Sequence, residues 1–308
     1  MESKEWETFF AKNQPPVDFE KKRQRIEEFC AQHLGSTEKI VLVTSGGTSV
    51  PLEHNMVRFI DNFSAGTRGS SSAEYFLAAG YAVIFLYRTN SLKPFVRHFK
   101  DGGLLDQLEL TEGESPGIRV RSEAVSQVLP VLRAFRAARE GGRLLAVPFT
   151  TLVDYLFLLR SASASLAAFG RRALLYLAAA VSDFYIPGEE MPEHKIHSET
   201  GPLQLHLQLV PKMLRPLVWL WVPEAFVVSF KLETDSDILL EKSRKALTNY
   251  KHKLVIANEL HSRKHHVLFV TQESHEAVDL SPAQLAAGIE IEELIVEKLS
   301  RQHALHMA

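Results

Sequence analysis

The feature that most constrains this chain is one stretch, residues 39–88, which predicts a strand, a glycine turn, a helix and a second strand. The apolar, β-branched run 40–44 is typical of a buried strand, and it stops at Ser45-Gly46-Gly47-Thr48. A polar segment then leads to a small-residue helix that ends at Gly80, and the strand 82–87 follows. The stretch therefore predicts one strand–helix–strand unit of an α/β fold.

The glycines of this stretch predict an anion-binding site. Gly46 and Gly47 let the backbone turn sharply and come close to a ligand, and Gly66 stands at the start of the expected helix. Free backbone N–H groups at a helix N-terminus bind anions, and phosphate is the anion that we expect. For any one of these glycines, a purely structural role in a turn or in helix packing stays open.

These glycines alone do not set the identity of the phosphate ligand. A Walker-type loop would need a Lys that the stretch lacks, and only part of a dinucleotide pattern is present, Ser64-x-Gly66-x-x-Gly69. Arg88 ends the second strand where a dinucleotide-binding chain carries an acidic residue. One open alternative is an NADP-dependent reductase on a Rossmann-like sheet, with Arg88 on the 2′-phosphate. Another is a non-catalytic nucleotide-binding interaction protein.

The composition of the chain excludes some classes of binding partner and indicates where the protein is located. The 308 residues carry a net charge of −2 and no long basic run, so we expect neither nucleic acid nor a membrane surface as a partner. Cys30 is the single cysteine, which excludes internal disulfides and cysteine-cluster metal sites. The N-terminus is charged and lacks the apolar segment of a signal peptide, and no apolar run is expected to span a bilayer. We therefore expect a cytoplasmic protein.

Apolar runs alternate with helical patterns along the rest of the chain. Residues 1–38 predict an N-terminal helical segment, and residues 39–308 predict a single α/β domain with an insertion near 89–121. Most expected strands are uniformly apolar, as in a parallel sheet covered on both faces; they lie at 143–147, 173–177, 225–230, 254–257 and 267–271. The pattern predicts a doubly wound, mostly parallel sheet in a Rossmann-like three-layer αβα arrangement.

Residues 184–211 depart from this order and predict a loop and a flap. Residues 185–200 contain Pro, Gly and charges of both signs, which is typical of a mobile surface loop. Residues 203–209 alternate strictly between Leu and polar residues, which predicts a half-buried strand in a small hairpin flap.

The candidate site residues follow separate strands or begin a helix: Gly46, Asn62, Gly66, Ala179, Asp183, Phe230 and Asn258. Because the strand ends of a doubly wound sheet meet at one edge, we expect these residues to lie together. The 13 histidines show no metal-ligand spacing, so we expect no metal site built from protein side chains.

Six motifs in a fixed order carry a family resemblance: LVTSGGT, RFIDNFSAGTRG, AAAVSDFY, PEHKI, SFKLETD and VIANEL. From residue 39 to the C-terminus, the chain closely resembles the phosphopantothenoylcysteine synthetase family, in the stand-alone form of animals. The resemblance implies ligation of 4′-phosphopantothenate with L-cysteine through an acyl-nucleotidyl intermediate, a step of coenzyme A biosynthesis. It also implies ATP or CTP as co-substrate, Mg²⁺ bound with the nucleotide, and a homodimer. The flavin-dependent domain of the bacterial fusion enzyme has no counterpart here, so we expect no flavin.

The same resemblance implies roles for individual residues. It implies phosphopantothenate contacts for Asn62, Ala179, Ala180 and Asp183, with Arg58 reaching the site of the other subunit. It implies nucleotide contacts for Gly46, Ser64, Gly66, Gly69, Phe230 and Asn258.

The predicted catalytic residues are Asn62 and Lys195. An amide donor such as Asn62 suits an oxyanion on the acyl carbon. A mobile cation such as Lys195 suits the charge that builds on phosphorus. Lys195 matches the first Lys of the bacterial K-x-K-K loop, although the later lysines are missing from Lys195-Ile196-His197-Ser198.

Overall fold

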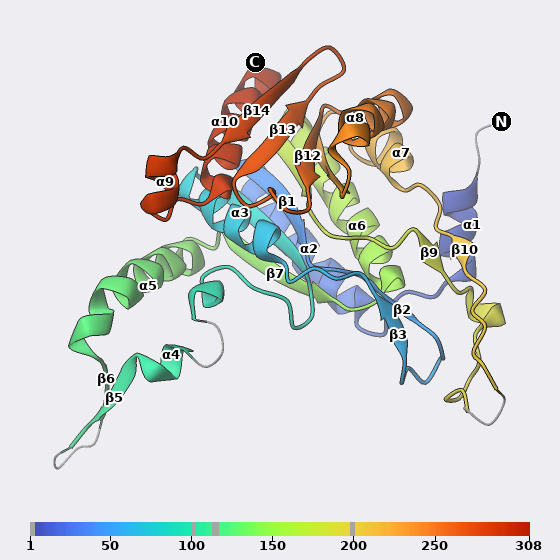
Figure 1. The fold of residues 1–308 in the computed structure, drawn as a ribbon, viewed down its shortest axis with the longest axis horizontal. Coiled ribbons are helices and arrows are strands. Elements are labelled where there is room, and N and C mark those ends of the chain that lie inside the picture. Colours follow the sequence, from blue (N-terminus) through green and yellow to red (C-terminus); the bar gives the residue numbers. More distant parts are fainter. Residues whose placement is uncertain (1–3, 100–102, 113–116, 198–200) are drawn as a thin grey trace.

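The computed structural model describes residues 4–99, 103–112, 117–197 and 201–308. Its centre is an eight-stranded sheet in the order β14-β13-β12-β11-β8-β1-β4-β7 (Figure 1). The strands are β1 (Lys39–Ser45), β4 (Tyr81–Arg88), β7 (Leu144–Phe149), β8 (Ala173–Leu177), β11 (Phe226–Glu233), β12 (Leu254–Glu259), β13 (His266–Val270) and β14 (His275–Asp279).

The first six of these strands in chain order run parallel, and they confirm the doubly wound fold. Chain order runs outward from β1 to β4 and β7 on one side, and then returns through β8 to β11 and β12 on the other. The order reverses between β1 and β8, where Leu42 pairs with Leu175. Open α/β sheets bind ligands at such a reversal, beyond the carboxyl ends of the strands.

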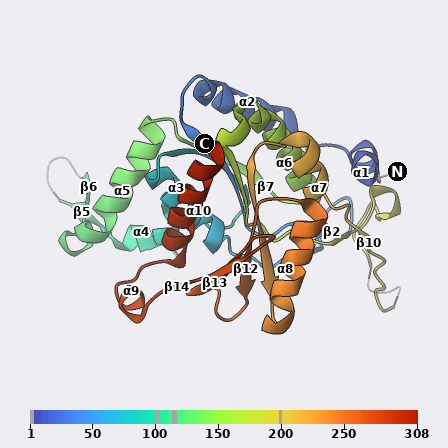
Figure 2. The ribbon, with the colours of Figure 1, turned by 90° about the horizontal axis from the view of Figure 1, so that it is seen from above.

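Helices cover both faces of the sheet, which explains why its central strands are uniformly apolar. One face packs against α2 (Phe19–Leu34), α6 (Leu152–Leu166) and α8 (Ser236–Tyr250). The other packs against α3 (Thr67–Ala78), α5 (Val125–Glu140) and α10 (Ile291–Met307). Figure 2 shows the two sets of helices on opposite sides of the strands.

The N-terminal helices share the main hydrophobic core. In α1 (Glu5–Lys12), the buried side chains Phe9 and Phe10 belong to the same cluster as Ile26 and Phe29 of α2. Phe10 lies 4.9 Å from the Phe157 ring of α6, in an edge-to-face arrangement. The segment 1–38 therefore packs on the sheet through aromatic contacts.

The structure contains strands that the sequence did not predict, at the antiparallel edge of the sheet and in the segment after β1. β13 is the predicted strand at 267–271, but it runs antiparallel to β12, and β14 continues that antiparallel edge. The polar segment after β1 forms a hairpin of β2 (Ser49–Pro51) and β3 (Phe59–Asp61). Strands of this length carry too little periodicity to be seen in a sequence.

Residues 184–211 contain a short hairpin, but the strand predicted at 203–209 is wrong. β9 (Phe184–Tyr185) and β10 (Gln208–Leu209) pair as a short antiparallel hairpin, so only the last two residues of 203–209 lie in a strand. All residues of 203–209 are exposed, so this segment has no half-buried face in the protomer. An alternating pattern gives a strand only where a neighbouring element covers its apolar side.

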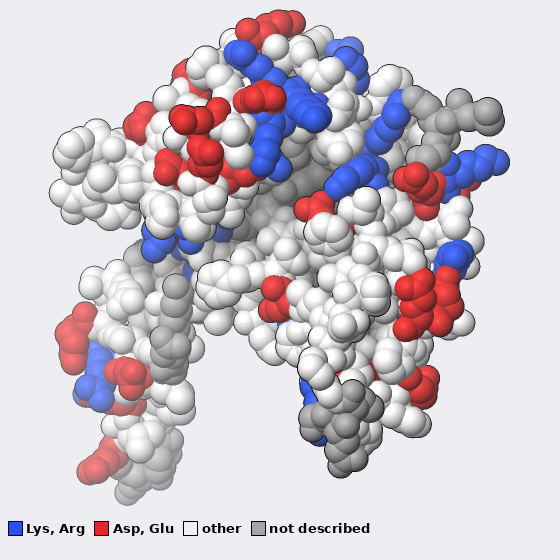
Figure 3. Space-filling model, turned by 45° about the vertical axis from the view of Figure 1, so that its right-hand side comes forward, with Lys and Arg blue, Asp and Glu red and all other residues white. Residues whose placement is uncertain are grey.

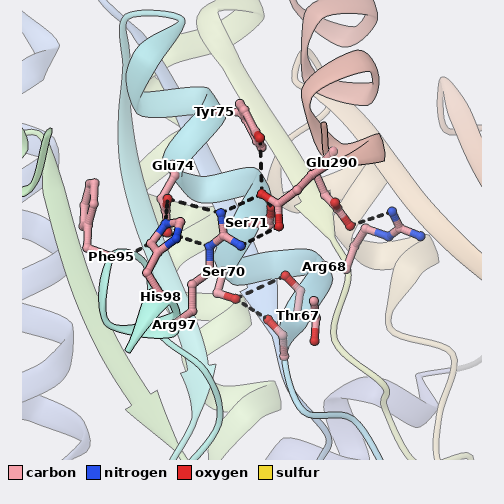
Figure 4. A network of polar contacts seen from close by, with 12 residues as sticks. Thr67, Arg68, Ser70, Ser71, Glu74, Tyr75, Phe95, Arg97, His98 and Glu290 are labelled. Atoms are coloured by element: carbon pink, nitrogen blue, oxygen red, sulfur yellow. Dashed lines mark hydrogen bonds and ion pairs between the residues drawn. The ribbon is translucent and has the colours of Figure 1, made fainter. Parts of the chain in front are cut away.

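The insertion predicted near 89–121 forms a projecting arm, which consists of α4 (Gly103–Asp106), β5 (Leu108–Thr111) and β6 (Gly117–Val120). Figure 3 shows the arm and the flap as two projections separated by an open gap below the body. The base of the arm is fixed at Arg97, which bonds Glu74 of α3 at 2.7 Å and Glu290 at 2.6 Å (Figure 4).

One helical stretch, Leu152–Arg172, is long and apolar enough to cross a membrane by length and composition. By this criterion, the expectation that no such run exists is wrong. Half of its most apolar window is buried inside the protein, and Leu156 and Leu159 pack in the core. A core helix passes the same test of length and composition, so the stretch is weak evidence for a membrane span.

Candidate functional site

The carboxyl ends of β1 and β8 meet as predicted. The Ala180 amide donates to the Gly46 carbonyl at 2.8 Å, and the Thr48 amide donates to the Ala180 carbonyl at 3.0 Å. Gly46, Ala179 and Ala180 therefore lie side by side at the point where the strand order reverses.

Asn62 returns to this point because the β2–β3 hairpin folds back on β1. Its backbone amide donates to the Thr48 carbonyl at 3.1 Å. A Cβ atom at Gly47 would lie 1.6 Å from the Asn62 carbonyl oxygen, so only glycine fits there. The Asn62 side chain is half-buried and has no hydrogen-bond partner in the described part of the chain. Its amide is available to a ligand.

The sequence placed Gly47 in a turn and did not include it among the site residues. Its signal is the second position of the Gly46-Gly47 pair. The structural reason, a close approach of two backbone segments, depends on a hairpin that the sequence does not reveal.

The N-terminus of α3 is pressed against the end of β1. Gly66 is the N-cap, with φ +80°, and no side chain caps the helix. A Cβ atom at Gly69 would lie 2.4 Å from the Ser45 Cβ, and the Gly66 amide donates to Ser64 Oγ at 3.4 Å. Uncapped N–H groups at the positive end of a helix dipole favour an anion.

Close packing also requires some of these glycines. Gly46 has φ +85°, and a Cβ there would lie 2.6 Å from the Arg88 Cβ. The packing role that the sequence left open for these glycines is therefore present. It is compatible with ligand binding, because a backbone without Cβ atoms can lie close to a ligand.

Arg68, in the first turn of α3, is a residue that the sequence analysis missed. Its guanidinium donates to Asn258 Oδ1 at 3.1 Å and to Glu292 Oε1 at 2.7 Å. Figure 4 shows Arg68 at this end of α3. Burial raises the pKa of Glu292, against the opposite effect of the Arg68 guanidinium. The only sequence signal was its place inside the motif RFIDNFSAGTRG.

Asn258 is buried, and both the oxygen and the nitrogen of its side-chain amide form hydrogen bonds. Besides accepting from Arg68, it donates through Nδ2 to the Lys231 carbonyl at 3.4 Å. The structure thus joins Asn258, at the end of β12, to the α3 N-terminus.

A cavity of about 300 Å³ opens beside the ends of β8 and β11. Asp183 and Lys212 line it and form an ion pair at 2.7 Å between Oδ1 and Nζ. Most of the remaining lining is apolar, including Leu156, Leu159, Leu177, Val181, Met213 and Phe230. The predicted residues Ala179, Asp183 and Phe230 therefore share one cavity.

Ser229 also lines this cavity, and His252 lies behind it. The Ser229 Oγ and His252 Nε2 atoms are 2.8 Å apart. Burial lowers the pKa of His252 to about 4, so the imidazole is neutral at physiological pH.

The two predicted cations that remain, Arg58 and Lys195, lie outside this edge of the sheet. Arg58 forms an ion pair with Glu53 of the same chain at 2.9 Å. Lys195 is exposed on the segment between β9 and β10 and forms no ion pair with another described residue. Residues 198–200 of the same segment lie outside the described part of the chain.

Arg88 does not offer a free guanidinium for a 2′-phosphate. Its Nη1 donates to Asp61 Oδ1 at 2.5 Å and to the Gly47 carbonyl at 3.2 Å. The side chain is largely buried and its charge is paired, which disfavours the reductase alternative.

Among the described residues, no group of three or more His, Cys, Asp or Glu side chains could hold a metal ion. The described residues at this edge offer backbone N–H groups, the Asn62 side chain and the ion pair of Asp183 with Lys212.

A phosphopantothenate–cysteine ligase of Mus musculus is 51% identical over 282 residues, which cover 90% of each chain. The chain belongs to the phosphopantothenate–cysteine ligase family. The corresponding ligase of Homo sapiens is 49% identical over the same coverage. The solved structure of a Cab2 mutant in complex with phosphopantothenate-cysteine has a TM-score of 0.89 and 41% identity, and covers 98% of both chains.

A family model, the DNA/pantothenate metabolism flavoprotein C-terminal domain, matches residues 160–290 of this ligase. The family and the enzyme class inferred from the motifs are thus confirmed. The roles of individual site residues stay predictions.

Proposed function

We propose that this ligase joins 4′-phosphopantothenate and L-cysteine to 4′-phospho-N-pantothenoylcysteine in two steps, with ATP as co-substrate and CTP as an alternative. The names of the mouse and human relatives support the two substrates, and the Cab2 complex supports the product. The reaction is a step of coenzyme A biosynthesis.

In the first step, an oxygen of the phosphopantothenate carboxylate attacks the α-phosphorus of the nucleotide, and pyrophosphate leaves. The product is a mixed anhydride, the acyl-nucleotidyl intermediate. Negative charge builds on the phosphoryl oxygens, which donors and cations stabilise. The uncapped α3 N-terminus, at Gly66, carries this proposal because it turns bare N–H groups toward the reversal of the sheet. Lys195 adds a mobile positive charge.

In the second step, the cysteine amine, as the free base, attacks the acyl carbon. The C–O bond to phosphate then breaks, the nucleoside monophosphate leaves, and the nitrogen loses one proton to solvent. An oxyanion forms on the acyl oxygen in the tetrahedral intermediate. The Asn62 amide is free to donate to it, and its backbone is fixed by Thr48 and Gly47. Fixed donors of this kind need no reorganisation during the reaction.

The cavity beside β8 and β11 suits the pantothenate chain. Its apolar lining fits the branched hydrocarbon part, while Asp183, Ser229 and Lys212 offer polar groups to the hydroxyl and amides. Ala179 and Ala180 lie at the adjacent strand end, and Phe230 and Asn258 extend the site toward the nucleotide together with Gly46, Ser64 and Gly69.

The nucleotide would bring its own Mg²⁺. No cluster of acidic side chains for a resident metal occurs in the described ranges, so we assign no step to the protein through a metal. We also propose that the reaction uses no flavin, since no bond formed or broken above involves electron transfer.

We further propose a homodimer formed through the outer side of the β2–β3 hairpin. Its apolar side chains are exposed, with Val57 at 57% and Phe59 at 47%, and Phe63 follows at 93%. Arg58 lies among them, and Asn62 is next to Phe63, so a second copy seated here would border the site. Contiguous exposed apolar groups mark such interfaces.

Sedimentation velocity tests the dimer. Val57→Arg places a charge in the proposed interface and should give a monomer at micromolar concentration. Ile118→Arg, on the exposed arm, should leave the dimer intact. A wild-type monomer, or a dimer lost only in the Ile118 variant, would contradict the proposed surface.

The buried, free Cys30 and the small-molecule substrates fit a cytoplasmic enzyme, and this location is part of the proposal. We propose neither a nucleic acid nor a membrane as a partner.

Pyrophosphate release tests the function directly. We expect release that requires ATP, phosphopantothenate and the protein together, and amide formation only after cysteine is added. An NADP-dependent reductase would consume NADPH without pyrophosphate, and a non-catalytic binder would do neither.

A further inference from the structure

Glu53, in the β2–β3 hairpin, is a fully buried carboxylate with four hydrogen-bond donors. One oxygen, Oε2, accepts from the Arg58 amide at 2.9 Å and from the Val57 amide at 3.3 Å. The other oxygen, Oε1, accepts from Arg58 Nη1 at 2.9 Å and from the Ile196 amide at 3.3 Å. Ile196 directly follows Lys195.

The Ile196 contact belongs to a longer seam between the hairpin and the loop after β9. The His54 amide donates to the Pro192 carbonyl at 2.9 Å, and the Asn55 amide donates to the Glu193 carbonyl at 3.1 Å. His54 Nε2 also lies 3.0 Å from the Gly188 carbonyl. The sequence predicts a mobile loop here, whereas the structure attaches its backbone to the hairpin at several points.

We propose that Glu53 is a positioning residue, which holds the Lys195 loop against the hairpin and orients Arg58 with the same carboxylate. The inference rests on the proposed function in that Lys195 serves the first step. Glu53 itself touches neither substrate. It acts through Ile196, whose bond fixes the chain at the residue next to the catalytic cation.

The carboxylate is charged at every working pH. The Arg58 amide, with the Ile196 and Val57 amides and the Arg58 guanidinium, lowers the pKa of Glu53 to about 2. A hydrogen bond from an N–H group to a charged carboxylate is stronger than a hydrogen bond to a neutral acceptor. The attachment should therefore not loosen between pH 5 and 9.

Glu53→Gln tests the assignment because it keeps the size of the side chain. The one oxygen of the new amide can keep only one of the two sets of donors. The two donors at Oε2 are backbone amides of the hairpin itself, so we expect the oxygen to stay with them and the NH₂ group to face Ile196 and break that bond. We expect the Ile196 amide to exchange with deuterium at least about tenfold faster than in the wild type. We expect pyrophosphate formation to slow by about tenfold. Amide formation from supplied acyl-adenylate and cysteine should stay within about twofold.

Two variants control for other effects. Glu193→Gln alters the same seam at an exposed side chain that, among the described residues, accepts a hydrogen bond from Asn55 Nδ2 alone. It should change neither exchange at Ile196 nor pyrophosphate formation. Arg58→Gln removes the ion pair but leaves the Ile196 bond, so protection of that amide should persist.

A double variant separates positioning from general stability. If Glu53 acts through Lys195, then adding Glu53→Gln to Lys195→Gln should slow the first step no further than Lys195→Gln alone. Fully additive losses, or equal losses in both steps, would overturn the proposal. So would unchanged exchange at Ile196. Because exchange needs no substrate, its result stands even if the wild type forms no pyrophosphate.

Discussion

Two regions of this ligase, the sheet edge and the hairpin with the Lys195 loop, are held by different forces. The sheet edge is fixed by steric necessity, since a single methyl group at Gly47 or Gly69 would overlap its neighbours. The hairpin and the Lys195 loop are joined by backbone hydrogen bonds and by one buried carboxylate, Glu53. The first kind of contact requires bare backbone at fixed positions, whereas the second depends on hydrogen bonds that a single substitution can remove.

The difference matches the demands of the two steps. An oxyanion hole works only if its donors stay in place, and Asn62 sits on the rigid side. In the proposed first step a triphosphate enters and pyrophosphate leaves, so we propose the cation for this step on a loop rather than on the sheet. We therefore assign the oxyanion donor of the second step to the sheet edge, and the cation that assists the α3 N-terminus in the first step to the loop.

The largest effect is expected from a substitution that disrupts the close packing at the sheet edge. Gly47→Ala would place Cβ 1.6 Å from the Asn62 carbonyl oxygen and push the two segments apart. Both steps should fail, and kcat/KM should fall by roughly a thousandfold, because a shift of about 1 Å already costs about a hundredfold. Gly35→Ala is the control, since a Cβ there meets nothing within 4 Å. A folded Gly47 variant with normal activity would show that the edge is not rigid.

Asn62→Asp changes only the side chain and leaves the backbone of the sheet edge in place. An ionised carboxylate cannot donate to the oxyanion and repels it, which costs about 3 kcal/mol, or about a hundredfold in amide formation. The acyl-nucleotidyl intermediate should accumulate and be visible by mass spectrometry in the presence of cysteine. If pyrophosphate release and amide formation fall equally, Asn62 has another role.

Lys195→Gln tests the mobile side. A neutral amide keeps the reach of the side chain but loses the charge, and a hydrogen bond to a charged group contributes about 1.5–3 kcal/mol. Single-turnover pyrophosphate release should slow by at least about tenfold. Lys21→Gln, at an exposed position on α2, should have no effect. Normal ATP turnover by the Lys195 variant would mean that another residue stabilises the phosphoryl charge. His197, Lys212 and Lys231 would then be tested.

The smallest effect is expected at the rim of the cavity. The ion pair of Lys212 and Asp183 is largely exposed, and such pairs contribute up to about 1 kcal/mol. Lys212→Gln should raise the KM for phosphopantothenate by up to about fivefold and leave kcat nearly unchanged. A large fall in kcat would place Lys212 in the chemistry.

The sequence revealed the sheet edge better than the hairpin and the loop. Apolar runs that end in Gly46, Ala179 and Asn258 predict strands whose ends converge, because a doubly wound sheet leaves them no other place. The motifs then supplied the enzyme class. The predicted strand at 203–209 failed because alternation does not show whether anything covers the apolar side.

Contacts between distant residues stayed hidden. Arg68 reaches Asn258 and Glu292 across 190 and 224 positions, and no local pattern marks such a pair. Glu53 looks like an ordinary surface acid in the sequence, and its burial appears only when the hairpin closes on the loop. Gly47 was visible as a glycine but not as a steric requirement.

One rescue measurement tests whether Asn62 acts in the second step and Lys195 in the first. Chemically made acyl-adenylate and cysteine are supplied to Asn62→Asp and to Lys195→Gln, and amide formation is followed in a single turnover. We expect the Lys195 variant to be restored to within about threefold of the wild type, while the Asn62 variant stays about a hundredfold slow. Rescue of both variants, or a Lys195 variant that remains slow, would contradict this assignment.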